Sequence, residues 1–164
     1  MNVFSLFGLR RPAAAPDTTP ARANRVQLSD ADWRARLTPV QHQVLRHEGT
    51  ERPHSSELND ETRRGTYCCA GCGLALFGSQ AKFDSGTGWP SFHTALPGAI
   101  GTRTDHQLLA LRTEYHCARC GGHQGHVFQD GPAPTGLRHC NNGVALRFEP
   151  DPASDFDPSG DDLP

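Results

Sequence analysis

The chain has 164 residues, of which 35% are apolar, and a formal net charge of −2 at pH 7. This length accommodates one domain with tails. The near-neutral charge argues against nucleic acid as a partner, because nucleic-acid-binding domains usually carry a basic surface. No apolar run approaches the roughly 20 residues of a membrane-spanning helix, so no membrane association is expected.

Composition divides the chain into three segments. Residues 1–27 are rich in Pro, Ala and Thr and predict a disordered tail, and the acidic, Pro-containing residues 150–164 predict a second one. The folded domain is therefore expected over residues 28–149. No apolar segment follows the twin arginines Arg10 and Arg11, so we expect a cytoplasmic protein, with organelle targeting by the N-terminal tail left open.

Two short helices are predicted at the start of the domain. Ser29 and Asp32 have the spacing of a capping box, which marks a helix N-terminus. Thr38 and Gln41 form a second box with a proline at the first helical position, and Gly49 is expected to end this second helix.

Beyond residue 50 the pattern predicts a mainly β fold. Gly, Pro and Asp recur every few residues and separate short apolar runs, which is typical of antiparallel strands joined by long loops. Such loops often carry functional residues. The expected strands are Thr66–Cys69, Leu74–Phe77, Leu108–Cys117, His126–Phe128 and Val144–Phe148.

Four of the six cysteines predict a metal site. They form two C-x-x-C pairs, each followed by glycine: Cys69 with Cys72, and Cys117 with Cys120. Four thiolates fill all positions of a tetrahedral zinc ion and leave none for a catalytic water, so we expect one structural Zn²⁺ per chain. A redox C-x-x-C motif and an iron–sulfur cluster are the alternatives.

Cys140 stands apart from these pairs and is predicted to be a reactive thiol. Arg138, two residues earlier, can stabilise the thiolate and lower its pKa. His123 and His126 lie three residues apart in what we interpret as a glycine-bracketed turn, where they can deliver a proton near neutral pH. Asp130 is expected to orient or charge one of them. A second metal site at the two histidines is the alternative, but no third ligand has suitable spacing.

Four strings carry a resemblance to a known family: G-T-E-R-P (49–53), F-D-S-G-T-G-W-P-S-F (83–92), H-Q-G-H-V-F-Q-D-G-P (123–132) and P-T-G-L-R-H-C (134–140). From about residue 30 to 149 the sequence closely resembles methionine sulfoxide reductase B. The resemblance implies two antiparallel sheets with a zinc site at the C-x-x-C pairs. It also implies reduction of methionine-R-sulfoxide in oxidised proteins, through a Cys140 sulfenic acid that thioredoxin or another thiol reduces.

The resemblance also implies roles for individual side chains. The family's matching positions include Trp89, His123, His126, Arg138, Cys140 and Asn142. We predict that Trp89 and Phe128 bind the substrate, with Trp89 as a flat apolar wall for its S-methyl group. Asn142 is expected to hydrogen-bond near Cys140. A monomeric repair enzyme that responds to oxidative stress is expected.

One departure from the family concerns regeneration of the thiol. Many members have a resolving cysteine where this chain has Thr87, and Cys68 is the only cysteine outside the pairs besides Cys140. Cys68 should point away from its neighbour Cys69 if both lie on a strand. Resolution by Cys68 and direct attack by an external thiol both stay open.

Further departures make the surroundings of the nucleophile more polar. The usual Tyr, Leu, Ile or Val, and Ser are replaced by His139, Gln124, Asn141 and Gly143, respectively. We expect these changes to affect substrate preference more than reaction type. His139 is predicted to place a second positive charge near the Cys140 thiolate in mild acid.

Two other functions are compatible with parts of the pattern. A zinc ribbon that binds protein or nucleic acid requires the paired cysteines alone, and leaves Cys140, Arg138 and Trp89 without a role. A thiol redox sensor would use Cys140 and Cys68 as its switch. Turnover of a sulfoxide substrate separates the enzyme from both.

Overall fold

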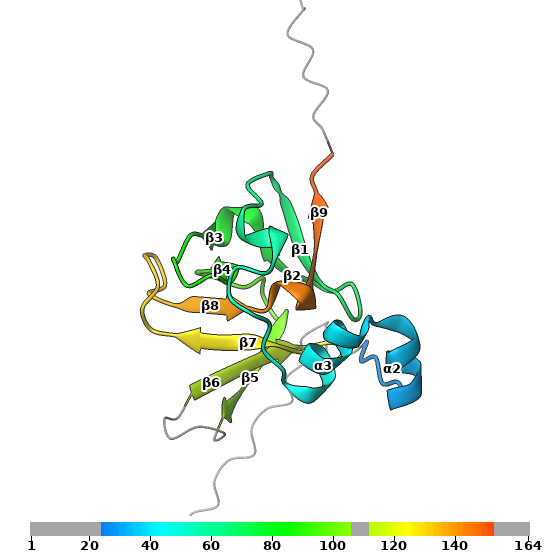
Figure 1. Cartoon of the computed structure of the whole chain (residues 1–164). Coiled ribbons are helices and arrows are strands. Elements are labelled where there is room, and N and C mark those ends of the chain that lie inside the picture. The colour runs from blue at the N-terminus through cyan, green and yellow to red at the C-terminus, as the bar shows by residue number, and fades with distance from the viewer. Residues whose placement is uncertain (1–23, 106–111, 153–164) are drawn as a thin grey trace, which may run out of the picture.

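Two antiparallel sheets and two short helices make up the computed structural model, which describes residues 24–105 and 112–152 (Figure 1). One sheet has three strands in the order β2-β1-β9, and the other has six in the order β3-β4-β8-β7-β6-β5. This confirms the predicted mainly β fold with two antiparallel sheets. Most of both predicted tails, residues 1–23 and 153–164, lies outside the described residues.

The larger sheet is built from consecutive strands, and the smaller sheet combines the two strands before them with the last strand of the chain. The smaller sheet contains β1 (Gly65–Cys69), β2 (Ala75–Gly78) and β9 (Leu146–Pro150). The larger one contains β3 (Lys82–Phe83), β4 (Ser91–Phe92), β5 (Ile100–Asp105), β6 (Arg112–Cys117), β7 (His123–Phe128) and β8 (Arg138–Asn141). Short 3₁₀ turns are η1 (Glu57–Asn59), η2 (Ser79–Ala81) and η3 (Gly143–Ala145).

Both predicted helices are present, with the predicted capping boxes at their starts. They are α2 (Asp30–Arg36) and α3 (Pro39–His47). The predicted end of α3 is wrong in detail. The left-handed residue is Glu48, with a φ of 56°, and the amide of Gly49 instead donates to the carbonyl of Gln43.

The predicted strands are found with shifted bounds, and β3, β4, β5 and β8 were not predicted. Of the expected Leu108–Cys117, the part before Arg112 lies outside the described residues, and Val144 belongs to η3 rather than to β9. β5 and β8 were missed because polar residues occupy most of their positions, so they lack the alternating apolar pattern of a half-buried strand.

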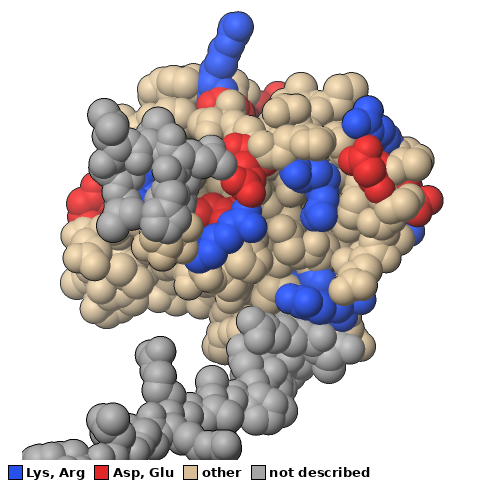
Figure 2. All heavy atoms as spheres, turned by 90° about the horizontal axis from the view of Figure 1, so that it is seen from below, with Lys and Arg blue, Asp and Glu red and all other residues tan. Residues whose placement is uncertain are grey.

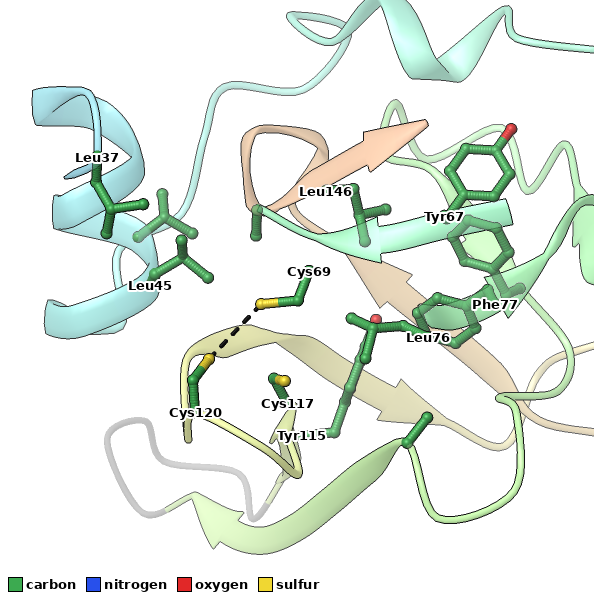
Figure 3. Packing of buried hydrophobic residues seen from close by; sticks show 14 of the residues in the cluster. Leu37, Leu45, Tyr67, Cys69, Leu76, Phe77, Tyr115, Cys117, Cys120 and Leu146 are labelled. Atoms are coloured by element: carbon green, nitrogen blue, oxygen red, sulfur yellow. Dashed lines mark hydrogen bonds between the residues drawn. The ribbon is translucent and has the colours of Figure 1, made fainter. Parts of the chain in front are cut away.

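The hydrophobic core lies between the two sheets and reaches α3 at one end (Figure 3). Phe77 stacks on Phe92 with 4.2 Å between ring centroids, and Tyr67 meets Phe92 edge-on at 4.9 Å. At the other end Leu45 of α3 faces the paired cysteines (Figure 3). The core therefore connects the aromatic centre of the fold with the predicted metal site.

A bulge in β7 sets the direction of its side chains. Tyr115 pairs with Gly125, but the next residue of β6, His116, pairs with His123, so Gln124 is an extra residue in β7. Side chains three apart on a regular strand point to opposite faces. The extra residue changes this alternation, and the rings of His123 and His126 lie 5.6 Å apart.

The surface shows mixed charge on the face drawn in Figure 2, where basic and acidic side chains are interspersed. Neither α2 nor α3, the helices of the described chain, has the length and apolarity needed to cross a membrane.

Gly125→Ala tests the close approach of β7 and β8. A Cβ at position 125 would overlap the carbonyl oxygen of Cys140, so overpacking should cost about 1–3 kcal/mol in unfolding free energy. Denaturant unfolding measures the loss. Gly71→Ala is the control, because its Cβ would have ordinary contacts, the nearest 3.5 Å from Trp33. Equal stability of the two variants would contradict the packing.

Candidate active site and metal centre

Cys140 lies in the middle of the larger sheet, on β8 between β4 and β7. Its cross-strand partners are Ser91 on β4 and His126 on β7. Directly paired residues in a sheet have their side chains on the same face, about 4.5–5.5 Å apart at Cβ. The register therefore brings His126 beside the Cys140 thiol, although the two residues are not adjacent in sequence.

A hollow of about 150 Å³ opens in front of Cys140. Besides Cys140, its lining includes four predicted site residues: Trp89, His126, Phe128 and Asn142. The other lining residues are Thr50, Arg112, Gly125 and Asn141. Polar, apolar and thiol groups thus converge on one small space. A second hollow, of about 620 Å³, also has Trp89 in its lining but does not include Cys140.

Arg138 is held by Asp130 in a two-pronged ion pair. Its Nε and Nη2 each donate to a carboxylate oxygen of Asp130 at 2.9 Å, and its guanidinium carbon lies 4.4 Å from the Phe128 ring centroid. This pair holds the pKa of Asp130 below its usual value. The prediction that Asp130 orients a histidine is therefore wrong in this structure, because its carboxylate binds Arg138 instead.

Burial dominates the acidity of Cys140. It raises the pKa of the thiol above its ordinary value, although the Arg138 charge and hydrogen bonds with Thr87 and Arg138 act in the lowering direction. The nearby Asp130 carboxylate also raises it. The predicted influence of Arg138 is present, but desolvation of the thiolate outweighs it.

The two histidines occupy different depths of the site. They lie on strand β7, not in the turn that the sequence suggested. His126 lines the hollow, whereas His123 is buried and its Nδ1 lies 2.6 Å from Oε1 of Glu114. Arg103 also reaches that carboxylate, with 3.2 Å from its Nη2 to Oε1. Glu114 was missed in the sequence, where its one signal was an acidic residue inside a predicted strand.

Asn142 and Glu51 position the Trp89 side of the hollow. The Asn142 side chain accepts from the Glu51 amide at 3.0 Å and donates to the Gln124 carbonyl at 3.0 Å. The carbonyl of Glu51 in turn accepts from Nε1 of Trp89 at 3.2 Å. The buried Glu51 carboxylate also accepts from the amides of Gly143 and Val144 at 2.5 and 3.0 Å. Glu51 was missed as a site residue, although it lies in the G-T-E-R-P string.

His139 does not add charge beside Cys140. It follows the opposite face of β8, where its ring lies 5.4 Å from Tyr115 and 5.8 Å from Phe77 between centroids. Its Nδ1 lies 3.1 Å from the carbonyl oxygen of Phe92. Burial lowers the pKa of His139, which disfavours the charged form of its ring. The predicted second positive neighbour is therefore wrong.

The paired cysteines converge as the sequence predicted. All four sulfur atoms lie within 4.8 Å of one another, with 3.7 Å between Cys69 and Cys120 and 3.5 Å between Cys72 and Cys117. A tetrahedral ion with sulfur at about 2.3 Å requires sulfur–sulfur distances of about 3.8 Å. The donor set and its spacing therefore fit a four-coordinate metal ion. Figure 3 shows Cys69, Cys117 and Cys120 of this set.

A second group of potential ligands is better explained as a contact between the helices. Asp30, His42 and His47 also have ligand atoms within 4.8 Å of one another. Both carboxylate oxygens of Asp30 are engaged, one by Nε2 of His42 at 2.8 Å and the other by Nε of Arg34 at 2.6 Å. These bonds account for the cluster without an ion.

Cys68 lies in the smaller sheet, away from the hollow. It is buried and pairs across the strands with Arg147 of β9, and its thiol interacts with Glu149. Burial and the Glu149 carboxylate raise the pKa of Cys68. Cys140 faces a hollow in the other sheet, so the geometry gives no direct support to pairing of the two thiols.

Comparison with known proteins identifies the family. The chain is similar to proteins named peptide methionine sulfoxide reductase MsrB from several bacteria. It is 51% identical to that of Bradyrhizobium diazoefficiens, covering 82% of this chain and 99% of the relative. The corresponding values are 53%, 77% and 94% for Agrobacterium fabrum, and 54%, 74% and 93% for Thiobacillus denitrificans.

Among solved structures, the crystal structure of the Mis18 Yippee-like domain shares 15% identity, with a TM-score of 0.41, and the match covers 53% of this chain and 96% of that one. This likeness is too weak to support an argument about function. The family description of the SelR domain, in contrast, matches residues 37–150, which is more than half of the chain. The chain therefore belongs to the MsrB family, which is characterised by the SelR domain.

Proposed function

We propose that this chain is a peptide methionine sulfoxide reductase that acts on the R epimer, with Cys140 as its nucleophile. The observation that carries the proposal is the position of Cys140, which faces a small hollow with Trp89 and Phe128 in its lining and His126 as cross-strand partner. The reaction class is supported by the names of the similar proteins and by the match, which covers nearly the whole length of each.

The proposed step transfers oxygen from substrate to enzyme. Cys140 attacks the sulfoxide sulfur and forms a transient sulfur–sulfur bond. This bond and the sulfur–oxygen bond of the substrate then break as the oxygen becomes bonded to the Cys140 sulfur. The products are methionine and a Cys140 sulfenic acid, so the sulfoxide is reduced and the thiol is oxidised by two electrons. The aromatic side chains of Trp89 and Phe128 would hold the S-methyl group during this step.

His126 is the proposed proton carrier. As the cross-strand partner of Cys140 it can take the thiol proton and supply a proton to the sulfoxide oxygen, which needs one in order to leave. His123 is buried against Glu114, so we propose that it orients His126 rather than contacting substrate. Asn142 and Asp130 would likewise act by positioning, the first through Glu51 and the second through Arg138.

An external thiol is proposed to regenerate Cys140. Two thiols reduce the sulfenic acid to the thiol, giving one disulfide and one water, and thioredoxin or another thiol reductant supplies them. Thr87 stands where a resolving cysteine is usual, and its side chain is close enough to Cys140 to act on the pKa of that thiol in the lowering direction. We therefore favour direct reduction over resolution by Cys68, whose thiol is buried beside Glu149.

The four-cysteine site is proposed to hold one structural Zn²⁺. Its four sulfur donors prefer zinc among the common divalent ions and leave no open coordination position. When bound, the ion would hold four thiolates and link the two sheets. The larger hollow beside Trp89 is proposed to receive the polypeptide around the oxidised methionine. A cytoplasmic location and a monomeric state remain predictions.

Cys140→Ser is expected to abolish reduction of N-acetyl-methionine-R-sulfoxide, with a loss of about a thousandfold or more, because the nucleophile is removed. Product analysis by chromatography measures this loss. Zinc content should stay at one ion per chain, because Cys140 is no ligand of the cluster. A serine variant that turns over normally would overturn the proposed nucleophile, and equal activity on the S epimer would contradict the stereochemical assignment.

Arg138→Gln is expected to move the pH midpoint of Cys140 alkylation by iodoacetamide upward. The Arg138 charge lowers the pKa of this thiol, so its removal makes the thiolate scarcer at neutral pH and slows alkylation there. The measurement uses a Cys68→Ser background, so that Cys140 is the free thiol. Arg34→Gln, an exposed arginine on α2, serves as control. A midpoint that does not move, or moves downward, would refute the role of Arg138.

Cys68→Ser distinguishes the two routes of regeneration. Turnover with thioredoxin and turnover with a small dithiol should both stay near the wild-type rate, because the proposed route needs no second cysteine in the chain. Steady-state rates with each reductant provide the measurement. Loss of activity with thioredoxin, while the small dithiol still supports turnover, would instead make Cys68 the resolving residue.

A further inference from the structure

A buried line of hydrogen bonds runs from the metal-site cysteine Cys69 to the strand that carries Cys140. Nε2 of Gln124 lies 3.5 Å from the sulfur of Cys69. Oε1 of Gln124 accepts from Nδ2 of Asn141 at 3.3 Å. Oδ1 of Asn141 accepts from the hydroxyl of Tyr115 at 2.6 Å. These four residues connect the metal site with β6, β7 and β8.

In all three hydrogen bonds the donor lies on the side of Tyr115 and the acceptor on the side of Cys69. Tyr115 donates to Asn141, Asn141 donates to Gln124, and Gln124 donates to the sulfur of Cys69. A metal-bound thiolate can only accept. It therefore requires the NH₂ group of Gln124 to face it, and this orientation leaves the Gln124 oxygen for Asn141. Hydrogen bonds aligned in this way strengthen one another.

Burial makes each of these bonds hard to replace. Gln124, Asn141, Tyr115 and Cys69 are each 0% exposed, so bulk water does not reach their polar atoms. A buried amide without its partner carries the full cost of its desolvation. Gln124 is also the extra residue of the β7 bulge, which turns its side chain toward Cys69.

Asn141 transmits the contact to the site. It follows Cys140 directly on β8, pairs with Gly125 of β7, and donates its backbone amide to the carbonyl of Pro90, next to Trp89. Its Nδ2 also donates to the carbonyl of Asn142 at 2.8 Å. A change in the side-chain position of Asn141 would therefore shift the backbone on both sides of Cys140.

We propose that Gln124 and Asn141 are a pair of positioning residues that couple the metal-bound Cys69 thiolate to the strand carrying Cys140. Neither is a metal ligand, and neither carries a chemical step in the proposed reaction, although Asn141 also lines the hollow in front of Cys140. Their function is to fix the position of β8 according to the state of the metal centre. What Cys140 does chemically rests on the proposed function, whereas the coupling itself does not.

A double-mutant cycle on zinc affinity tests the coupling. Asn141→Val touches no ligand, but it removes the donor to Gln124 Oε1 and the acceptor of the Tyr115 hydroxyl. It should weaken zinc binding about 10-fold, as outer-shell changes commonly do. Gln124→Leu should weaken binding by a similar factor. In the Gln124→Leu background, Asn141→Val should have little further effect. Competition of the holoenzyme with a chromophoric chelator measures each affinity.

Two controls separate coupling from general loss of stability. Phe148→Leu trims a half-buried ring that packs 4.9 Å from Tyr67 between centroids, and should leave zinc affinity within about twofold at matched loss of melting temperature. Gln124→Glu keeps the size of the side chain but replaces the donor to sulfur with an acceptor. It should bind zinc no more tightly than Gln124→Leu.

Several results would overturn the proposal. The first is an Asn141→Val variant with unchanged zinc affinity. The second is a double variant whose loss of zinc affinity equals the product of the two single losses. The third is a Gln124→Glu variant that binds zinc as tightly as the wild type. Zinc affinity is measured without any sulfoxide substrate. If turnover is intact but the coupling is absent, only this proposal fails. If the coupling is intact but turnover is absent, only the proposed reductase function fails.

Discussion

The pairing of β8 between β4 and β7 is the constraint on which the site depends. It places Cys140 opposite His126 and beside Ser91, three residues that are dispersed over 50 positions of the sequence. The approach of β7 to β8 is so close that Gly125 has no room for a side chain. A shift of one residue in this register would turn Cys140 to the other face of the sheet.

The four-cysteine site lies beyond the paired strands and stabilises their arrangement. Cys69 and Cys72 come from the end of β1 and the turn before β2, whereas Cys117 and Cys120 come from the end of β6 and the turn before β7. A bound metal would therefore join the two sheets at one end of the core, where Leu45 of α3 packs nearby (Figure 3). The turn that supplies Cys120 leads directly into the strand that carries His126.

The sequence predicted the parts of the molecule that depend on local patterns. Capping boxes depend on residues three apart, and the C-x-x-C pairs depend on a gap that lets two sulfurs reach one ion. These features were confirmed. The conformation of Glu48 and the loss of alternation at Gln124 were not foreseeable, because tertiary contacts decide them.

Partnerships across the sheets were also beyond the sequence. Asp130 is nearer in the sequence to His126 than to Arg138. The β7–β8 register nevertheless places it beside Arg138, with which it forms an ion pair. Glu114 and Glu51 are distant from their partners in sequence, so no spacing rule pointed to them. β8 was missed for a related reason. Its polar residues are buried by specific hydrogen bonds rather than by an apolar pattern, which is common where a strand carries a functional site.

The most direct test of the central claim is a single turnover without reductant. The enzyme is mixed with methionine-R-sulfoxide, treated with dimedone to trap any sulfenic acid, digested, and mapped by mass spectrometry. The account predicts one methionine formed per chain and a dimedone adduct on the peptide that contains Cys140. Methionine formed with the adduct on Cys68, or no methionine at all, would contradict it.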